Sequence, residues 1–73
     1  MTQEEKIGML EEMMGLEEGS LTADTELSDL PEWDSVAVIS FVVLMDEQFS
    51  KQISGAQIRG FVTVADALAV MMQ

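Results

Sequence analysis

The segment from Val36 to Met45 constrains the fold most, because every residue in it except Ser40 is apolar. Asp34 stands just before this segment, and Asp favours the N-cap position of a helix. The sequence therefore predicts a helix that Asp34 caps and that runs to about Phe49. A surface helix is normally polar on one side, so this helix carries more apolar surface than one core contact requires.

The predicted helix carries two apolar stripes when its residues are placed at about 100° intervals. The first stripe is wide enough to face a core and consists of Val38, Phe41, Val42, Met45 and Phe49. The second, which we call the aliphatic strip, consists of Val36, Ile39 and Val43 on the opposite flank, among Ser40, Asp46 and Glu47. Leu44 falls between the two stripes. The aliphatic strip is interpreted either as a docking surface for a partner or as ordinary core covered by the third helix and the long loop.

Three further helices are predicted from residues that favour helix starts. These signals are Thr2 with Glu5, Ser54, and Thr63 with Asp66. Gly15 ends the first helix, and the third is short, covering only residues 55–59. Residues 16–33 are rich in Gly, Ser, Thr, Asp and Pro, and are predicted to form a long loop held to the core by its leucines. We therefore expect an all-α fold of four helices and one domain, residues 1–73.

The charge and composition exclude several classes of function. Fourteen acidic residues against three basic ones give a net charge of −11, which would be repelled by nucleic acids and anionic membrane surfaces but would attract basic proteins. The chain has no Cys and no His, which argues against an enzyme and a metal site. Asp24, Glu26 and Asp29 also lack the spacing of a calcium-binding loop.

The N-terminal residues do not resemble a signal peptide, because no basic stretch is followed by an apolar one. No apolar run reaches about 18 residues, the length expected of a membrane-spanning helix. We therefore expect a cytoplasmic monomer without membrane insertion.

Ser35 is the best candidate for a functional atom in this chain. Its hydroxyl is predicted at the N-terminus of the longest helix, where free N–H groups and the helix dipole favour a phosphate. The alternative is that Asp34-Ser35 serves only to cap the helix. The chain supplies no base or oxyanion hole for Ser35, so another enzyme would have to activate it.

These features together resemble the acyl carrier protein family, which includes peptidyl and aminoacyl carriers, over nearly the whole chain. In that family an Asp-Ser-Leu motif opens the second of four helices, after a long loop and before a short third helix. The motif stands here as Asp34-Ser35-Val36. Asp46-Glu47-Gln48-Phe49 lies near the helix end, and the apolar positions at similar spacing are Ile53, Phe61, Val64 and Leu68. The resemblance implies a four-helix bundle of the acyl-carrier type, with a long loop between helices one and two.

The same resemblance implies that Ser35 carries a 4′-phosphopantetheine arm derived from coenzyme A, with Asp34 as the cap and part of the motif. The partners would be a phosphopantetheinyl transferase and the acyl- or aminoacyl-loading and acyl-transfer enzymes, which dock through basic patches. On this chain the docking residues would be Val36, Ile39, Val43, Asp46 and Glu47. The arm would hold acyl or aminoacyl groups as thioesters.

This chain departs from the family pattern around the motif. Trp33 stands where Gly or Ala is frequent, and Val36 replaces Leu. Ala37 and Ser40 replace acidic residues that are common in fatty-acid carriers, so partner contacts should depend more on the aliphatic strip. We therefore expect a carrier in a specialised biosynthetic pathway. The alternative is a carrier-like helical module that binds other proteins and is never modified.

Overall fold

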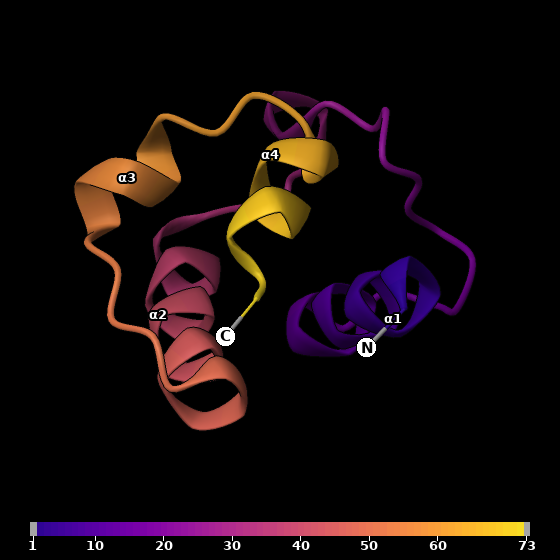
Figure 1. Ribbon diagram of the computed structural model, residues 1–73. Helices are drawn as coiled ribbons and strands as arrows, with labels where there is room; N and C mark the ends of the chain where they lie inside the picture. The colour runs from indigo at the N-terminus through magenta and orange to yellow at the C-terminus, as the bar shows by residue number, and fades with distance from the viewer. Residues whose placement is uncertain (1, 73) are drawn as a thin grey trace.

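A computed structural model describes residues 2–72 of the chain as a small all-α protein. Its helices are α1 (Gln3–Met14), α2 (Ser35–Phe49), α3 (Gly55–Arg59) and α4 (Val64–Val70), and a short 3-10 helix, η1, spans Leu27–Asp29. α2 packs against both α1 and α3, and α4 packs against α1, as Figure 1 shows. Residues 2–72 contain no strand, only one isolated bridge between Glu26 and Thr63. The all-α prediction is confirmed.

The four helices begin at the residues that the sequence predicts, and α1 ends at Gly15 as predicted. The N–H of Glu5 donates to the Thr2 hydroxyl, and the N–H of Thr2 donates to the Glu5 carboxylate, each at 3.2 Å. Gly15 ends α1 in the left-handed conformation, with φ at 70°. These local hydrogen bonds satisfy backbone groups that a helix end leaves free. None of the helices within residues 2–72, α2 included, has the apolar length needed to cross a bilayer.

The core is built around α2, and Phe41 lies fully buried at its centre. Trp33 and Phe61 each meet the Phe41 ring edge-on, with ring centroids 6.1 Å and 5.9 Å away. Edge-on contacts of this kind add to the stabilisation from burial alone. The buried stripe predicted on this helix is confirmed except at Val42, which is only half-buried. The other fully enclosed large side chains within residues 2–72 are Leu10, Leu27, Met45, Ile58, Val64 and Met71.

The long loop between α1 and α2 packs against the core through buried leucine side chains and is held by backbone hydrogen bonds. Leu21 and Leu27 are buried, as their spacing among polar residues predicts. The loop runs beside the start of α4, where the N–H of Val64 donates to Thr25 O and the N–H of Leu27 donates to Val62 O, both at 2.9 Å. These contacts fix the path by which the chain reaches α2 (Figure 1).

Glu11 on α1 has a buried carboxylate, and nothing in the sequence indicates that this side chain is buried. It is 4% exposed, and its Oε2 accepts hydrogen bonds from the N–H groups of Gly19 (2.9 Å) and Leu21 (3.0 Å). One side chain thus satisfies two loop donors that would otherwise lack partners. Glu11 therefore joins the first part of the loop to α1.

Replacing Glu11 with Ala is expected to lower the free energy of unfolding by about 1–3 kcal/mol, because the loop N–H groups lose their acceptor. Urea unfolding measures this loss. Glu12→Ala is the matched control, since Glu12 is the exposed neighbour on the same helix, and it should change stability by less than about 0.5 kcal/mol. Equal effects of the two substitutions would contradict the role given to Glu11.

Asp66 is expected to make the fold sensitive to acid. The backbone N–H of Val62, and next that of Thr63, hold the pKa of the Asp66 carboxyl below its ordinary value of 3.8. The stabilisation from this lowered pKa is complete above the ordinary value and is lost as the pH falls through the folded-state pKa. Asp66→Asn should therefore show a smaller fall in Tm between about pH 5 and about pH 2.5 than the wild type does. Asp24→Asn, at an exposed carboxylate, is the control, and a fall in Asp66→Asn as large as in the wild type would contradict the expectation.

Candidate functional site

The candidate site lies at the start of α2, where Asp34 forms the N-cap. The N–H of Ala37 donates to Asp34 Oδ1 at 3.0 Å, and the N–H of Val38 donates to the Asp34 backbone carbonyl at 3.0 Å. Asp34 itself has an extended backbone, as an N-cap residue does. The capping function of the Asp-Ser pair therefore belongs to Asp34 alone.

Ser35 is the first residue of α2, and its side chain is exposed. Its hydroxyl forms no hydrogen bond with any group in residues 2–72. The backbone N–H groups of Ser35 and Val36 likewise have no partner in this part of the chain. A free hydroxyl and two free donors therefore meet at the positive end of the longest helix dipole. No base is hydrogen-bonded to the hydroxyl, so Ser35 is not activated by its own chain.

A shallow hollow of about 350 Å³ adjoins Ser35. The loop, α2 and the segment around α3 contribute its lining, which is Leu27, Ser28, Trp33, Asp34, Ser35, Val38, Arg59 and Phe61. Trp33, whose ring meets Phe41, and the core stripe residue Val38 thus form part of the wall of this hollow. The packing of α3 against α2 brings Arg59 to the same hollow.

Arg59 is the functional candidate that the sequence does not single out. It is one of only three basic residues in the chain, and no carboxylate within residues 2–72 forms an ion pair with it. Its guanidinium folds back over α3, so that Nη1 would lie 3.7 Å from a Cβ added at Gly55. A cation in a hollow at a helix N-terminus favours an anionic group there. Its rarity as a basic residue in a strongly acidic chain is the only signal in the sequence that points to it.

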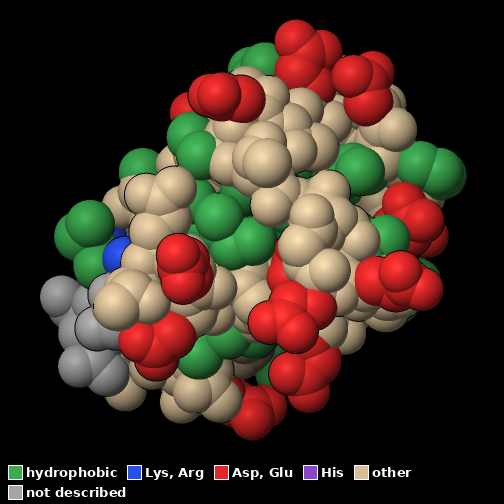
Figure 2. All heavy atoms as spheres, turned by 90° about the vertical axis from the view of Figure 1, so that its right-hand side faces the viewer, with side chains coloured by type: hydrophobic (Ala, Val, Ile, Leu, Met, Phe, Trp, Pro, Cys, Tyr) green, Lys and Arg blue, Asp and Glu red, His purple; other side chains and the backbone are tan. Residues whose placement is uncertain are grey.

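The aliphatic strip is exposed along the same helix. Val36, Ile39 and Val43 are 69%, 64% and 48% exposed, so the interpretation that the loop and α3 cover them is wrong. Asp46 and Glu47 are exposed at the far end of the strip. Figure 2 shows the α1 side of the molecule, where acidic side chains are also prominent. An apolar strip bordered by carboxylates is typical of a surface that contacts another protein.

No protein-family model, no curated protein sequence and no solved structure gave a significant match to this chain.

The division of roles at the site predicts different effects of substitutions at adjacent residues. Asp34→Ala should lower the free energy of unfolding by about 0.5–2 kcal/mol, because the first turn of α2 loses its cap. Asp34→Asn keeps an acceptor oxygen and should remain close to the wild type. Ser35→Ala should also be nearly neutral, since its hydroxyl has no intramolecular hydrogen bond. Thermal unfolding of the three variants checks this, and a large loss in Ser35→Ala would contradict the assignment of the cap.

Proposed function

We propose that this protein is an acyl or aminoacyl carrier and that Ser35 is the attachment point of a 4′-phosphopantetheine arm. The observation that carries the proposal is the free, exposed hydroxyl of Ser35 at the start of α2. Because Asp34 already caps the helix, this hydroxyl has no structural task that modification would disturb. The fold we propose on the same basis is the acyl-carrier type of four-helix bundle, whose second helix opens with the modified serine.

The surroundings of Ser35 suit a phosphodiester. The free N–H groups of Ser35 and Val36 can donate to its oxygens, and the helix dipole favours its negative charge. Arg59 lines the same hollow and offsets part of the repulsion from a chain of net charge −11. When bound, the arm supplies a terminal thiol that carries cargo as a thioester, a group that a chain without Cys cannot provide.

Attachment of the arm requires a partner enzyme. The Ser35 Oγ would form a bond to the phosphorus next to the pantetheine of coenzyme A, and the bond from this phosphorus to the bridging oxygen would break, releasing adenosine 3′,5′-bisphosphate. The Oγ proton must pass to a base of the transferase, since no group in residues 2–72 accepts a hydrogen bond from this hydroxyl. The exposed position of Ser35 leaves it accessible to such an enzyme.

Partner enzymes would dock on the aliphatic strip and on Asp46 and Glu47. The strip lies on the helix that Ser35 opens, so a docked enzyme would have the attachment site within reach. Carboxylates beside the strip would speed the approach of basic surfaces, which suits an encounter that must also end quickly. Ala37 is buried and Ser40 half-buried where fatty-acid carriers have acidic residues, which supports cargo from a specialised pathway.

The test is intact-mass analysis after incubation with coenzyme A and a broad-specificity phosphopantetheinyl transferase. We expect the addition of a single phosphopantetheine group. Ser35 is exposed at the start of α2 with a free hydroxyl, whereas the hydroxyl of Ser54, the exposed serine that caps α3, accepts a hydrogen bond from the N–H of Gln57. Ser35→Ala should abolish the adduct. Ser28→Ala is the matched control, since Ser28 is an exposed serine that lines the same hollow, and it should be modified like the wild type.

A folded protein that acquires no adduct would contradict the carrier function. That result would favour the alternative, an unmodified helical module whose function is to bind other proteins through the aliphatic strip. An adduct that persists in Ser35→Ala would assign the attachment to another residue and would equally overturn the role of Ser35.

A further inference from the structure

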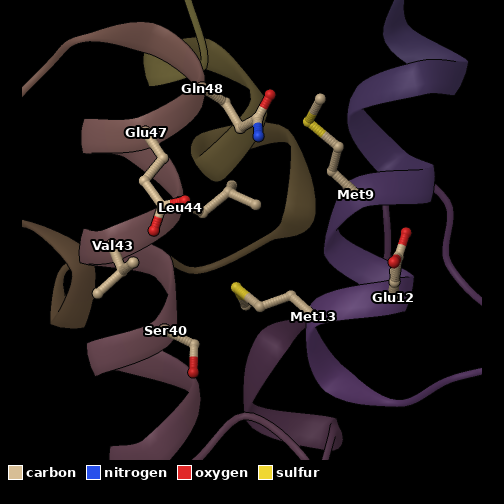
Figure 3. A pocket seen from close by; sticks show the side chains of 8 residues that line it. All are labelled: Met9, Glu12, Met13, Ser40, Val43, Leu44, Glu47 and Gln48. Carbon is tan, nitrogen blue, oxygen red and sulfur yellow. The ribbon is translucent and has the colours of Figure 1, made fainter.

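A groove of about 470 Å³ lies between α1 and α2 on a part of the surface that does not include Ser35. Both helices contribute its lining, which is Met9, Glu12, Met13, Ser40, Val43, Leu44, Glu47 and Gln48. Figure 3 shows Met9 and Met13 extending from α1 toward α2, and Leu44 extending from α2 toward α1. These three side chains are only half-buried. The groove therefore has an apolar floor that solvent still reaches.

The groove adjoins the aliphatic strip, because Val43 lines the groove and belongs to the strip. Methionine side chains are flexible and polarizable, and they adapt to the shape of an apolar group placed against them. The side chains of α2 that line the groove extend from Ser40 to Gln48, a length of about 12 Å at the helical rise of about 1.5 Å per residue. About two turns of a partner helix would fit along this length.

The edges of the groove are acidic. Glu12 stands on α1 and Glu47 on α2, and both side chains are exposed (Figure 3). None of the three basic residues of the chain, Lys6, Lys51 and Arg59, is part of the lining. A helix seated between the two carboxylates would be favoured if it carried Lys or Arg on both sides of an apolar face.

We propose that this groove binds a basic amphipathic helix of a partner protein. The inference rests on the proposed function in that it names the element by which a partner enzyme would be held. Apolar side chains of that helix would contact Met9, Met13 and Leu44, while its basic side chains would pair with Glu12 and Glu47. The occupied groove would extend the contact from the aliphatic strip across to α1.

The test is an NMR titration of the protein with a synthetic 14-residue peptide of Leu and Lys, arranged so that all Leu lie on one face of a helix. We expect the largest shifts at the methyl groups of Met9, Met13 and Leu44. A peptide of the same composition in scrambled order has the same charge without an apolar face, and it should bind at least about tenfold more weakly. Equal binding of the two peptides would overturn the proposal, because charge alone would then explain the binding.

Charge reversal provides matched variants. Glu12→Lys combined with Glu47→Lys should weaken binding of the amphipathic peptide by about tenfold or more, since like charges would then oppose each other. Glu17→Lys combined with Asp29→Lys changes the net charge equally at exposed carboxylates outside the groove, and its effect should be several-fold smaller. Equal losses in the two double variants would overturn the proposal. So would shifts of the three methyl groups with decanoic acid but none with the peptide, since the groove would then be a small-ligand site.

The peptide titration is repeated on Ser35→Ala, whose binding should equal that of the wild type. The outcome is therefore independent of the attachment of phosphopantetheine. If Ser35 is modified and the peptide does not bind at the groove, the carrier function stands and the docking proposal fails. If the peptide binds and Ser35 is never modified, the groove remains a protein-binding site and the carrier function fails.

Discussion

The hydrogen bond from the N–H of Ala37 to the carboxylate of Asp34 fixes where α2 begins. Side chains advance by about 100° per residue, so the residues of α2 fall on distinct faces, and the packing of its apolar stripe against α1 and α3 decides which face is enclosed. With the helix starting at Ser35, Phe41 and Met45 are enclosed and Val36 and Ile39 are exposed. The same bond leaves the hydroxyl of Ser35 without an intramolecular partner. The cap thus sets the start of α2 and leaves Ser35 free, while the packing of the helix decides which of its side chains remain exposed.

The packing of the other helices covers one face of α2, which stabilises the fold, and leaves another face exposed, where a partner could bind. α1 and α3 contact α2, and the ring of Phe41 is held edge-on by Trp33 from the loop and by Phe61. The aliphatic strip remains uncovered, and the hollow at Ser35 and the groove beside α1 lie at different places along the same helix. A chain of 73 residues can bury only a modest core, so most of its apolar side chains are needed to stabilise the fold. The apolar side chains left in solvent on α2 therefore favour a role in contacts with other molecules.

Features set by local chemistry could be predicted from the sequence, and features set by tertiary packing could not. Thr2, Ser54 and Gly15 mark helix ends through bonds to near neighbours, so they show the bounds of the helices directly. The strip and the position of Ser35 follow from helical periodicity. Glu11 gives no such signal, because its bonds reach Gly19 and Leu21 across a loop whose path is fixed by the core. The placement of Arg59 in the hollow that adjoins Ser35, and the groove between α1 and α2, likewise depend on how the helices pack. Val42 is less buried than its place in the stripe predicts.

The most direct measurement of the central claim is tandem mass spectrometry of the protein isolated from the organism that makes it. Cleavage after basic residues would place Ser35 in the fragment of residues 7–51, which also contains Ser20, Ser28, Ser40 and Ser50. Fragment ions can then assign a modification among these serines. The carrier function predicts phosphopantetheine on Ser35 and on no other residue of the fragment. An unmodified Ser35 in protein from cells that contain an active transferase would contradict it.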